Sequence, residues 1–351
     1  MEKFLPEICT IQYGFPFDSA KFSTSEGMPL IRIRDVVRGY SETFTTEEYK
    51  EEYIVNKDDL LISMDGEFNI AKWGETPALL NQRVCRLLPK SEVDKNYLFY
   101  FMPSALKRIE EKTPFVTVKH LSAKELNKVK VPLPSLEEQH RIAALLDKVS
   151  DLIAKRRAQL DKLDLLVKAR FVEMFGDPVK NDKGLPTMMG QNFFKLSNGK
   201  FVPENKRFDK GIPAYGGNGI SWYTDETLYE ENTIVVGRVG FQSGNVHFAK
   251  GPLWITDNAM YISNHNASKC DLFFLYVLME HIDFTRFQDA GDLKKITQKP
   301  FMSMEYIMPT LSQQREYISF AEQIDKSKLT IQQSLDKLGI LKKALIQQYL
   351  G

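Results

Sequence analysis

Cysteine is scarce in this chain, and its placement suggests neither a metal site nor a disulfide. The three cysteines, Cys9, Cys85 and Cys270, are far apart, form no CxxC pair and have no histidine cluster nearby. A sparse, odd-numbered set of cysteines is typical of proteins from a reducing compartment. We therefore expect a cytoplasmic protein without disulfides and without a structural zinc ion.

Long apolar runs are also missing. No stretch approaches the roughly 18 consecutive apolar residues that a membrane span requires. The first residues, MEKFLPEICTIQYGF, lack the basic segment and the apolar run of a signal peptide. We expect neither secretion nor a membrane partner.

An excess of charge of either sign is absent too. There are 47 basic and 46 acidic residues, which gives a formal net charge of +1. The segments interpreted below as globular are equally balanced, with 19 basic and 20 acidic residues in 1–131 and 14 and 15 in 177–308. This balance argues against a protein that holds nucleic acid through overall positive charge. A domain can still gather its cations on one face.

The usual catalytic signatures are missing. The sequence contains no GxxxxGK[ST] phosphate loop, no GxGxxG turn, no GxSxG elbow, no HExxH pair and no NPPY-type tetrapeptide. The carboxylates of Asp65-Gly66-Glu67 are ordinary turn chemistry. No two histidines stand at metal-ligand spacing among His120, His140, His247, His265 and His281. These absences favour a recognition or scaffolding component that is not an enzyme by itself.

What the chain does contain is an internal repeat. At an offset of 175 residues, LDKLDLLVKARFVEMFG (160–176) aligns with LDKLGILKKALIQQYLG (335–351). The same offset, without a gap, also aligns three identical residues further upstream. Pro134 aligns with Pro309, Leu136 with Leu311, and Gln139 with Gln314. A period of 175 in a chain of 351 residues indicates a tandem duplication.

Each copy of the repeat predicts a long helix. Ser135 with Glu138, and Thr310 with Gln313, have the spacing of capping boxes. Alternating steps of four and three give an apolar a/d seam over four heptads, which is the pattern of a coiled coil. The seam comprises Ile142, Leu146, Val149, Ile153, Leu160, Leu163 and Val167 in the first copy, and Ile324, Ile331, Leu335, Leu338 and Leu345 in the second. Lys328 and Lys342 also fall on the second seam, where we expect them to weaken its packing or to contact a partner.

The segments before the two helices differ in sequence but share a plan. DDLLISMDGE and ENTIVVGRVG lie at nearly equivalent places, and each predicts a buried strand that enters a turn. An aromatic helical stretch follows in each segment, and we expect its rings in the core. The predicted order is a globular domain (1–131), a long helix (132–176), a second globular domain (177–308) and a second long helix (309–351).

Candidate ligand contacts are polar and aromatic residues in the turns of the globular segments. Arginine, asparagine and glutamine suit bidentate contacts with guanine and adenine edges, and lysine suits phosphates. A single such residue is usually an ordinary surface residue, so only clusters of them point to nucleic acid. The candidates are Arg32, Arg34, Lys72, Trp73, Asn81, Gln82 and Arg83 in the first segment, and Lys200, Lys206, Arg207, Tyr215, Asn218, Arg238, Gln242 and Ser243 in the second.

Two further strings carry a family resemblance. VPLPSLEEQHRIAALLDKVSDLI, continued by ARFVEMFGDPV, resembles the central conserved region of type I restriction–modification specificity subunits. MPTLSQQREYISFAEQIDK is similar to their C-terminal conserved region. These segments cover both predicted long helices, about a quarter of the chain.

The resemblance implies an α+β fold, in which a mixed α/β target recognition domain and a long helix are duplicated in tandem. The two helices would form an antiparallel coiled coil with pseudo-twofold symmetry, and each globular domain would read one half of a split sequence in double-stranded DNA. Two modification subunits with S-adenosylmethionine, and restriction subunits with ATP and Mg²⁺, are the implied partners. This chain would bind none of these cofactors and would carry no catalysis.

The predicted helix length agrees with that picture. Forty residues at 1.5 Å per residue make a rod of roughly 60 Å, longer than the ~34–36 Å of one DNA turn. The half-sites would therefore flank an unread spacer, and dissimilar domains predict an asymmetric target. Two alternatives stay open: the specificity component of a related fused or two-subunit restriction–modification enzyme, and a tandem coiled-coil protein–protein scaffold without a DNA role. The neutral charge of both domains slightly favours the scaffold, but a DNA-sequence recognition subunit is the main hypothesis.

Overall fold

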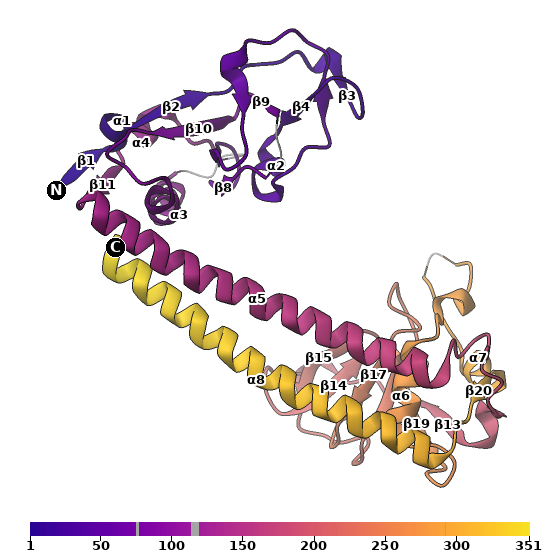
Figure 1. Cartoon of the computed structure of the whole chain (residues 1–351). Coiled ribbons are helices and arrows are strands. Elements are labelled where there is room, and N and C mark those ends of the chain that lie inside the picture. Colours follow the sequence, from indigo (N-terminus) through magenta and orange to yellow (C-terminus); the bar gives the residue numbers. More distant parts are fainter. Residues whose placement is uncertain (75–76, 114–118, 292) are drawn as a thin grey trace. The chain divides into compact units, whose positions relative to one another are not determined.

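Both long helices are shared between two compact units. The computed structural model describes residues 1–74, 77–113, 119–291 and 293–351. Unit 1 consists of Met1–Arg157 with Gln332–Gly351, and unit 2 consists of Ala158–Ile331. Each unit therefore contains one globular domain and about half of each long helix (Figure 1). The four segments predicted from the sequence follow one another along the chain, whereas unit 1 combines two separate stretches of it.

The globular part of unit 1 holds a four-stranded sheet in the order β2-β10-β7-β8, a five-stranded sheet in the order β3-β5-β4-β9-β6, and the pair β1-β11. Its elements are β1 (Glu2–Phe4), α1 (Leu5–Ile8), β2 (Cys9–Tyr13), η1 (Ser19–Lys21), β3 (Phe22–Ser23), β4 (Met28–Ile31), α2 (Ile33–Arg38), β5 (Phe44–Thr45), η2 (Glu51–Tyr53), β6 (Ile54–Val55), β7 (Leu60–Ser63), β8 (Ile70–Lys72), β9 (Ala78–Leu80), β10 (Val84–Pro89), α3 (Lys95–Lys112), α4 (Ala123–Asn127) and β11 (Lys130–Pro132).

The globular part of unit 2 repeats this plan with a four-stranded sheet in the order β13-β19-β16-β17, a three-stranded sheet in the order β15-β14-β18, and the pair β12-β20. Its elements are β12 (Thr187–Met189), η3 (Gly190–Asn192), β13 (Phe194–Asn198), η4 (Glu204–Lys206), β14 (Ile212–Gly216), β15 (Gly219–Thr224), β16 (Thr233–Gly237), β17 (Val246–Ala249), β18 (Trp254–Ile255), β19 (Ala259–His265), α6 (Leu272–Glu280), η5 (Thr285–Phe287), α7 (Gln298–Ser303) and β20 (Glu305–Ile307).

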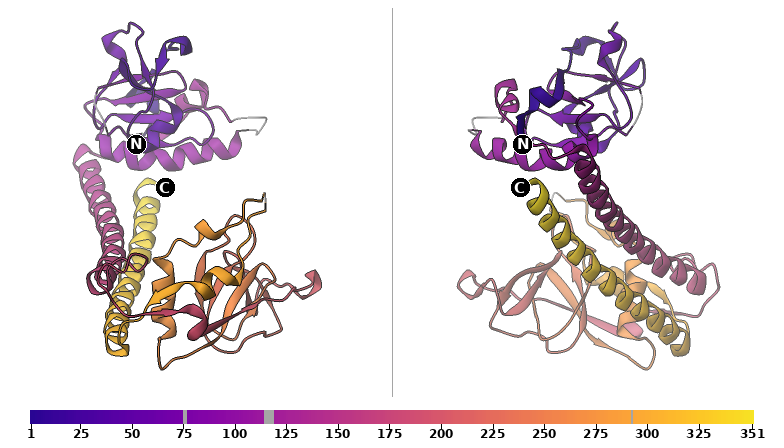
Figure 2. Two further views of the ribbon diagram at one scale, coloured as in Figure 1. Left: turned by 90° about the vertical axis from the view of Figure 1, so that its right-hand side faces the viewer. Right: turned by 60° about the vertical axis from the view of Figure 1, so that its left-hand side comes forward.

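The duplication predicted from the sequence is confirmed at the level of the sheets. The strand predicted in DDLLISMDGE is β7 and the one in ENTIVVGRVG is β16, and each is the third strand of its four-stranded sheet. The aromatic stretches form α3 and α6, and Tyr97, Phe101 and Phe274 lie in the cores as expected. In unit 1, α3 lies across one side of the globular domain (Figure 2).

The long helices are α5 (Leu136–Phe175) and α8 (Leu311–Leu350). The capping box predicted at Thr310 is complete, because Thr310 accepts from the Gln313 amide at 3.4 Å and Gln313 Oε1 accepts from the Thr310 amide at 3.0 Å. At Ser135 only half of the box forms. The Glu138 amide donates to Oγ of Ser135 at 3.3 Å. The Glu138 carboxylate accepts from the Arg141 guanidinium instead of from the Ser135 amide.

The predicted seam is the inward side of both helices. Its residues are buried or half-buried, whereas the residues between them are mostly exposed. In unit 2 the helices are antiparallel, since Asp164 pairs with Lys328 while the later residue Arg170 pairs with the earlier residue Glu316. In unit 1, Arg141 near the start of α5 stacks on Tyr349 near the end of α8, 5.2 Å from the ring centroid.

Each of the two seam lysines has a partner within its own unit. Lys328 Nζ lies 2.7 Å from Asp164 Oδ1, and this hydrogen bond raises the pKa of Lys328. Lys342 Nζ lies 5.5 Å from the centre of the Tyr100 ring, and burial lowers the pKa of Lys342.

One buried glutamine attaches each globular domain to its long helix. Gln139 Oε1 accepts from the Asp94 amide, and Gln139 Nε2 donates to the carbonyls of Glu92 and Pro134. Gln314, its repeat equivalent, bonds in the same way to the Asp271 amide and to the carbonyls of Lys269 and Pro309. Asp94 and Asp271 cap α3 and α6, so each glutamine ties a long helix to the helix that closes the core.

Candidate nucleic-acid interface

A pair of parallel strands brings the candidate loops together in each unit. In unit 1, β4 and β9 run parallel, with Ile31 opposite Leu80. In unit 2, β14 and β18 run parallel, with Tyr215 opposite Ile255. Because parallel strands end at the same edge, the residues that follow them are neighbours. Arg32–Arg34 and Asn81–Arg83 meet in this way in unit 1.

A glycine fixes the approach of the chain to this edge in both units. A Cβ on Gly14 would lie 2.0 Å from the carbonyl oxygen of Asn81. A Cβ on Gly199 would lie 2.0 Å from the carbonyl oxygen of Thr256. No other residue fits at either position without moving the backbone. Asn81 and Thr256 are thus equivalent, and so are the turns that they begin.

In unit 1 the edge surrounds a cavity of about 480 Å³. Five of the residues predicted from the sequence line it, namely Arg32, Arg34, Asn81, Gln82 and Arg83. Phe17 and Phe22 supply an aromatic wall, and the described lining contains three arginines and no carboxylate. A domain that is neutral overall therefore presents a locally cationic, partly aromatic hollow. That chemistry suits a nucleic acid.

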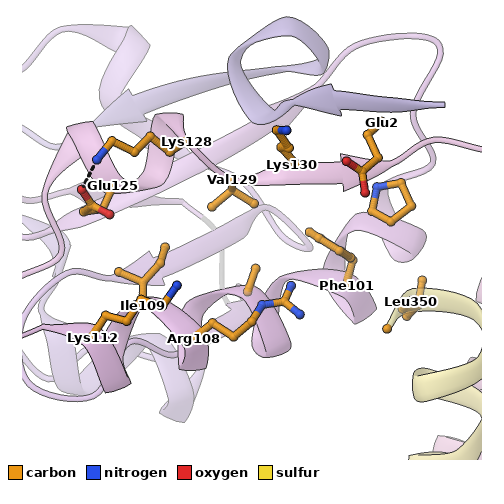
Figure 3. A pocket seen from close by; sticks show the side chains of 13 residues that line it. Glu2, Phe101, Arg108, Ile109, Lys112, Glu125, Lys128, Val129, Lys130 and Leu350 are labelled. Atoms are coloured by element: carbon orange, nitrogen blue, oxygen red, sulfur yellow. Dashed lines mark hydrogen bonds and ion pairs between the residues drawn. The ribbon is translucent and has the colours of Figure 1, made fainter.

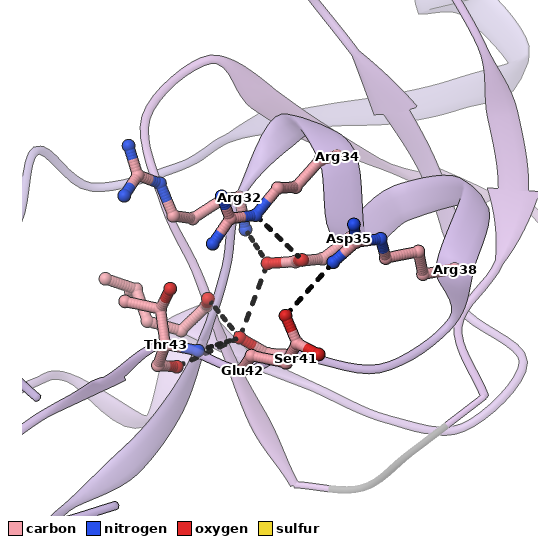
Figure 4. Close-up of polar contacts among 8 residues, drawn as sticks. Arg32, Arg34, Asp35, Arg38, Ser41, Glu42 and Thr43 are labelled. Carbon is pink, nitrogen blue, oxygen red and sulfur yellow. Dashed lines mark hydrogen bonds and ion pairs between the residues drawn. The ribbon is translucent and has the colours of Figure 1, made fainter. Parts of the chain in front are cut away.

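Asp35 contacts the backbone of Arg32 and the side chain of Arg34 (Figure 4). This buried carboxylate stands at the start of α2, where its Oδ2 accepts from the Arg32 amide at 2.9 Å. Its Oδ1 lies 3.7 Å from Nε of Arg34. Ser41, also buried, supports the carboxylate from below, 3.4 Å from Oδ2. Arg38, one turn later, is paired with Glu42 instead.

Arg83 is held by a separate group of residues. Its Nε lies 3.6 Å from Asp65 Oδ2, and its Nη1 lies 3.1 Å from Nδ1 of His120. The same His120 nitrogen is 2.5 Å from Asp65 Oδ1. Asp65 and His120 come from distant parts of the chain and are joined by a backbone bridge.

Two of the predicted residues of unit 1 lie elsewhere. Trp73 is only 1% exposed and packs in a core cluster with Ile31 and Leu61, so its indole cannot reach a ligand. Lys72 in β8 lies against α3, with its Nζ 5.0 Å from the centre of the Phe99 ring. The prediction that Trp73 contacts DNA is therefore wrong, and Lys72 does not line the arginine cavity.

In unit 2 the equivalent edge carries side-chain amides. Asn245 Nδ2 donates to Oδ1 of Asn218 at 3.3 Å and to Oε1 of Gln242 at 2.5 Å, which brings two predicted residues together. Arg238 adjoins them, with Nη1 3.5 Å from the carbonyl oxygen of Asp257. Asn218 and Gln242 thus meet through Asn245 at the turn ends, and Arg238 precedes Gln242 in the same turn.

The other predicted residues of unit 2 are engaged within the protein or buried. Lys206 pairs with Glu226, and Arg207 stacks 4.4 Å from the centre of the Trp222 ring while it donates to the Val202 carbonyl. Tyr215 is half-buried, and burial raises its pKa. Lys200 is exposed. Ser243 is completely buried, so the prediction that its hydroxyl contacts DNA is wrong.

Phe241 was missed by the sequence reasoning. Its side chain is 89% exposed, in the same turn as Gln242 and two residues from Val239. A phenylalanine after Gly240 in GRVGFQSG was a visible signal, because an aromatic residue in a glycine-rich turn has little opportunity for burial. Exposed aromatic side chains beside polar ones are typical of surfaces that stack on bases.

A second cavity of unit 1, of about 490 Å³, has a different character (Figure 3). It lies between α3, α4, β11 and the end of α8. Arg108, Lys112, Lys128 and Lys130 face it, but so do Glu2 and Glu125, and Lys128 is paired with Glu125. The sequence-predicted candidates, all of which the structure describes, lie outside its lining.

The described residues show no group of three or more His, Cys, Asp or Glu side chains that would hold a metal ion. Among those residues, no helix is long and apolar enough to cross a membrane.

The fold is that of a known class of protein. A specificity (S) subunit of a type I restriction–modification system from M. genitalium aligns with 99% of this chain and 94% of its own, with a TM-score of 0.64 and 15% identity. A chain from a structure of complex assembly and conformational transition in the type I R-M system gives a TM-score of 0.62 at 15% identity, over 99% of this chain and 96% of its own.

The family follows from the sequence comparison. The model for the type I restriction modification DNA specificity domain matches residues 1–163 and 191–338, and the chain belongs to this family. The predicted relation to type I specificity subunits is thereby confirmed.

Curated relatives carry the same name. The type I restriction enzyme EcoBI specificity subunit of Escherichia coli is 38% identical over 166 residues, 47% of this chain. The putative type I restriction enzyme MjaX specificity subunit of Methanocaldococcus jannaschii is 23% identical over 348 residues, which cover 85% of this chain and 80% of that protein. The alignments span 35% of the EcoBI subunit and 59% of the MjaVIII specificity subunit of M. jannaschii.

Proposed function

We propose that this chain reads an asymmetric, bipartite DNA target for a type I restriction–modification complex and has no catalytic activity of its own. The observation that carries the proposal is the equivalent edge in the two units. Both edges follow a parallel strand pair and a glycine in close contact, yet one carries arginines and the other carries amides. Different side chains in equivalent places suit two different half-sites.

The long helices offer matching surfaces for two copies of a partner. Leu165 and Leu166 on α5 are exposed, and so are Ile340 and Leu341 on α8, their equivalents at an offset of 175. Exposed apolar residues on a helix favour a protein contact. We propose that each pair receives one modification subunit, and that S-adenosylmethionine, ATP and Mg²⁺ belong to the partner subunits. Such a complex would act in the cytoplasm, where DNA and these cofactors occur.

The proposed function is tested by expressing the chain with its modification subunits and sequencing the methylated bases of the host DNA. The expected result is adenine methylation at one split motif. Exchange of residues 177–308 for another such domain should change one half of that motif and leave the other intact. No new motif, with a demonstrably active modification subunit present, would overturn the proposal and favour the scaffold without a DNA role.

Partner docking has its own test. Leu165→Glu with Leu166→Glu, and separately Ile340→Glu with Leu341→Glu, should each reduce the number of modification subunits from two to one in native mass spectrometry. Lys155→Glu, on an exposed face of α5, is the matched control and should leave two. Unchanged stoichiometry in both double variants would place the partner elsewhere.

A further inference from the structure

We propose that Arg83 is a specificity-determining residue that reads a guanine in the half-site of the first domain. The inference rests on the proposed function, because it names the base that one part of that surface recognises. Arginine donates two parallel hydrogen bonds to O6 and N7 of guanine in the major groove, and this is the commonest specific contact between proteins and DNA.

The orientation of Arg83 suits that task. Its side chain is 52% exposed at the rim of the arginine cavity, whereas Asp65 behind it is 22% exposed. Asp65 and His120 approach Nε and Nη1, and among the described residues Nη2 makes no hydrogen bond. A guanidinium held from one side by a carboxylate loses less freedom when it binds a base. The exposed side keeps donors for the guanine.

The backbone at Arg83 adds a separate observation. Arg83 has φ of +70°, in the left-handed region that is costly for a long side chain. Its carbonyl oxygen accepts from the Met64 amide at 2.9 Å, so the turn is fixed in this conformation. Glycine or asparagine would adopt the same backbone more readily. The presence of an arginine in this unfavourable backbone conformation therefore favours a binding role for its side chain.

Arg32 fits a different role from Arg83. Cζ of Arg32 lies 6.0 Å from the centre of the Phe22 ring, and within the described part of the chain no carboxylate forms an ion pair with its guanidinium. Arg34 is directed by Asp35 at the foot of α2. A flexible cation suits a phosphate, which carries no sequence information. Arg32 thus serves as a contrast, since its loss should weaken all DNA sequences equally.

The second domain has a different residue at the equivalent place. The Arg238 amide donates to the Asn258 carbonyl at 2.9 Å, which repeats the bond between Met64 and Arg83. Asn258 is exposed. Asparagine makes bidentate contacts with adenine rather than guanine. The corresponding position of the second half-site is therefore an adenine in this proposal.

The test uses the chain assembled with its modification subunits and selects bound duplexes from a randomised library. Wild type should give a split motif with a guanine in one half. Arg83→Ala should reduce the preference for that guanine by roughly 5- to 140-fold and leave the other half unchanged. Asp65→Asn should relax the same base pair more weakly, at an unchanged melting temperature, because it positions Arg83 without touching DNA.

Three controls separate this effect from a loss of charge or of fold. Arg108→Ala removes an exposed arginine of the same unit and should change no base preference. Arg32→Ala should lower affinity for every sequence alike. Asn258→Ala should relax one position in the other half-site only.

The outcomes are distinct. If wild type selects no split motif, the proposed function itself fails. If wild type selects a split motif but Arg83→Ala retains it, or if the half-site of the first domain contains only A·T pairs, the function stands and the role of Arg83 is refuted.

Discussion

Replacement of Gln139 or Gln314 by alanine should loosen one unit and spare the other. Gln139 has no exposed surface and makes three hydrogen bonds to backbone groups, at 2.9, 3.1 and 3.0 Å. Alanine leaves all three groups buried without a partner. At about 1 kcal/mol for each hydrogen bond, Gln139→Ala should lower the free energy of unfolding of unit 1 by about 3 kcal/mol. The same geometry at Gln314 predicts the same loss in unit 2.

Hydrogen–deuterium exchange with mass spectrometry assigns the loss to a unit. Gln139→Ala should speed exchange in α3, which begins at the Asp94 cap, and leave α6 unchanged; Gln314→Ala should do the reverse. Urea unfolding gives a second readout, because Trp73 reports unit 1 while Trp222 and Trp254 report unit 2. Gln333→Ala, at an exposed position of α8, should change stability by less than about 0.5 kcal/mol. Equal effects of all three variants, or a loss below 1 kcal/mol for Gln139→Ala, would refute the reasoning.

Three more predictions concern a seam lysine, the buried cysteines and an exposed phenylalanine. Lys328→Leu should raise the free energy of unfolding of unit 2 by about 1 kcal/mol in urea, because an apolar seam residue stabilises the helix pair more than a partly exposed ion pair does. A lower free energy of unfolding would show that the ion pair with Asp164 contributes more. Burial raises the pKa of the thiols of Cys9, Cys85 and Cys270 to about 12. At pH 8 the folded chain should therefore react with iodoacetamide on the order of 10³-fold more slowly than the unfolded chain. The stability that these thiols contribute should be full below about pH 9 and should disappear as the pH rises towards 12. Phe241→Ala should weaken target binding by the assembled complex roughly 5- to 100-fold at an unchanged melting temperature, and unchanged binding would exclude stacking by this ring.

The helices and the duplication were predictable because they depend on local periodicity. Heptad spacing gave the buried side of α5 and α8, and the repeat register already paired Gln139 with Gln314. Their role in joining each helix to a domain was not visible. It depends on backbone groups at Glu92 and Lys269, whose positions are set by tertiary packing.

The candidate residues show the same limit. Arg32 and Arg34 are local neighbours, but their meeting with Arg83 depends on the parallel pairing of β4 with β9. The sequence AKWG suggested that Trp73 is an exposed turn residue, but its indole, directly after β8, is buried in a core cluster. Sequence pattern identified which residue types bind nucleic acid, whereas long-range strand pairing decided which of them share one surface.

The division of the chain into units has a consequence for synthesis on the ribosome. Leu350 is 1% exposed and packs in the same core as Ile142 and Phe101, although it lies at the other end of the sequence. The nascent first domain must therefore wait, with part of its core uncovered, until residues 332–351 emerge. Unit 2, a continuous stretch from Ala158 to Ile331, has no such delay, so the domain made first is the domain finished last.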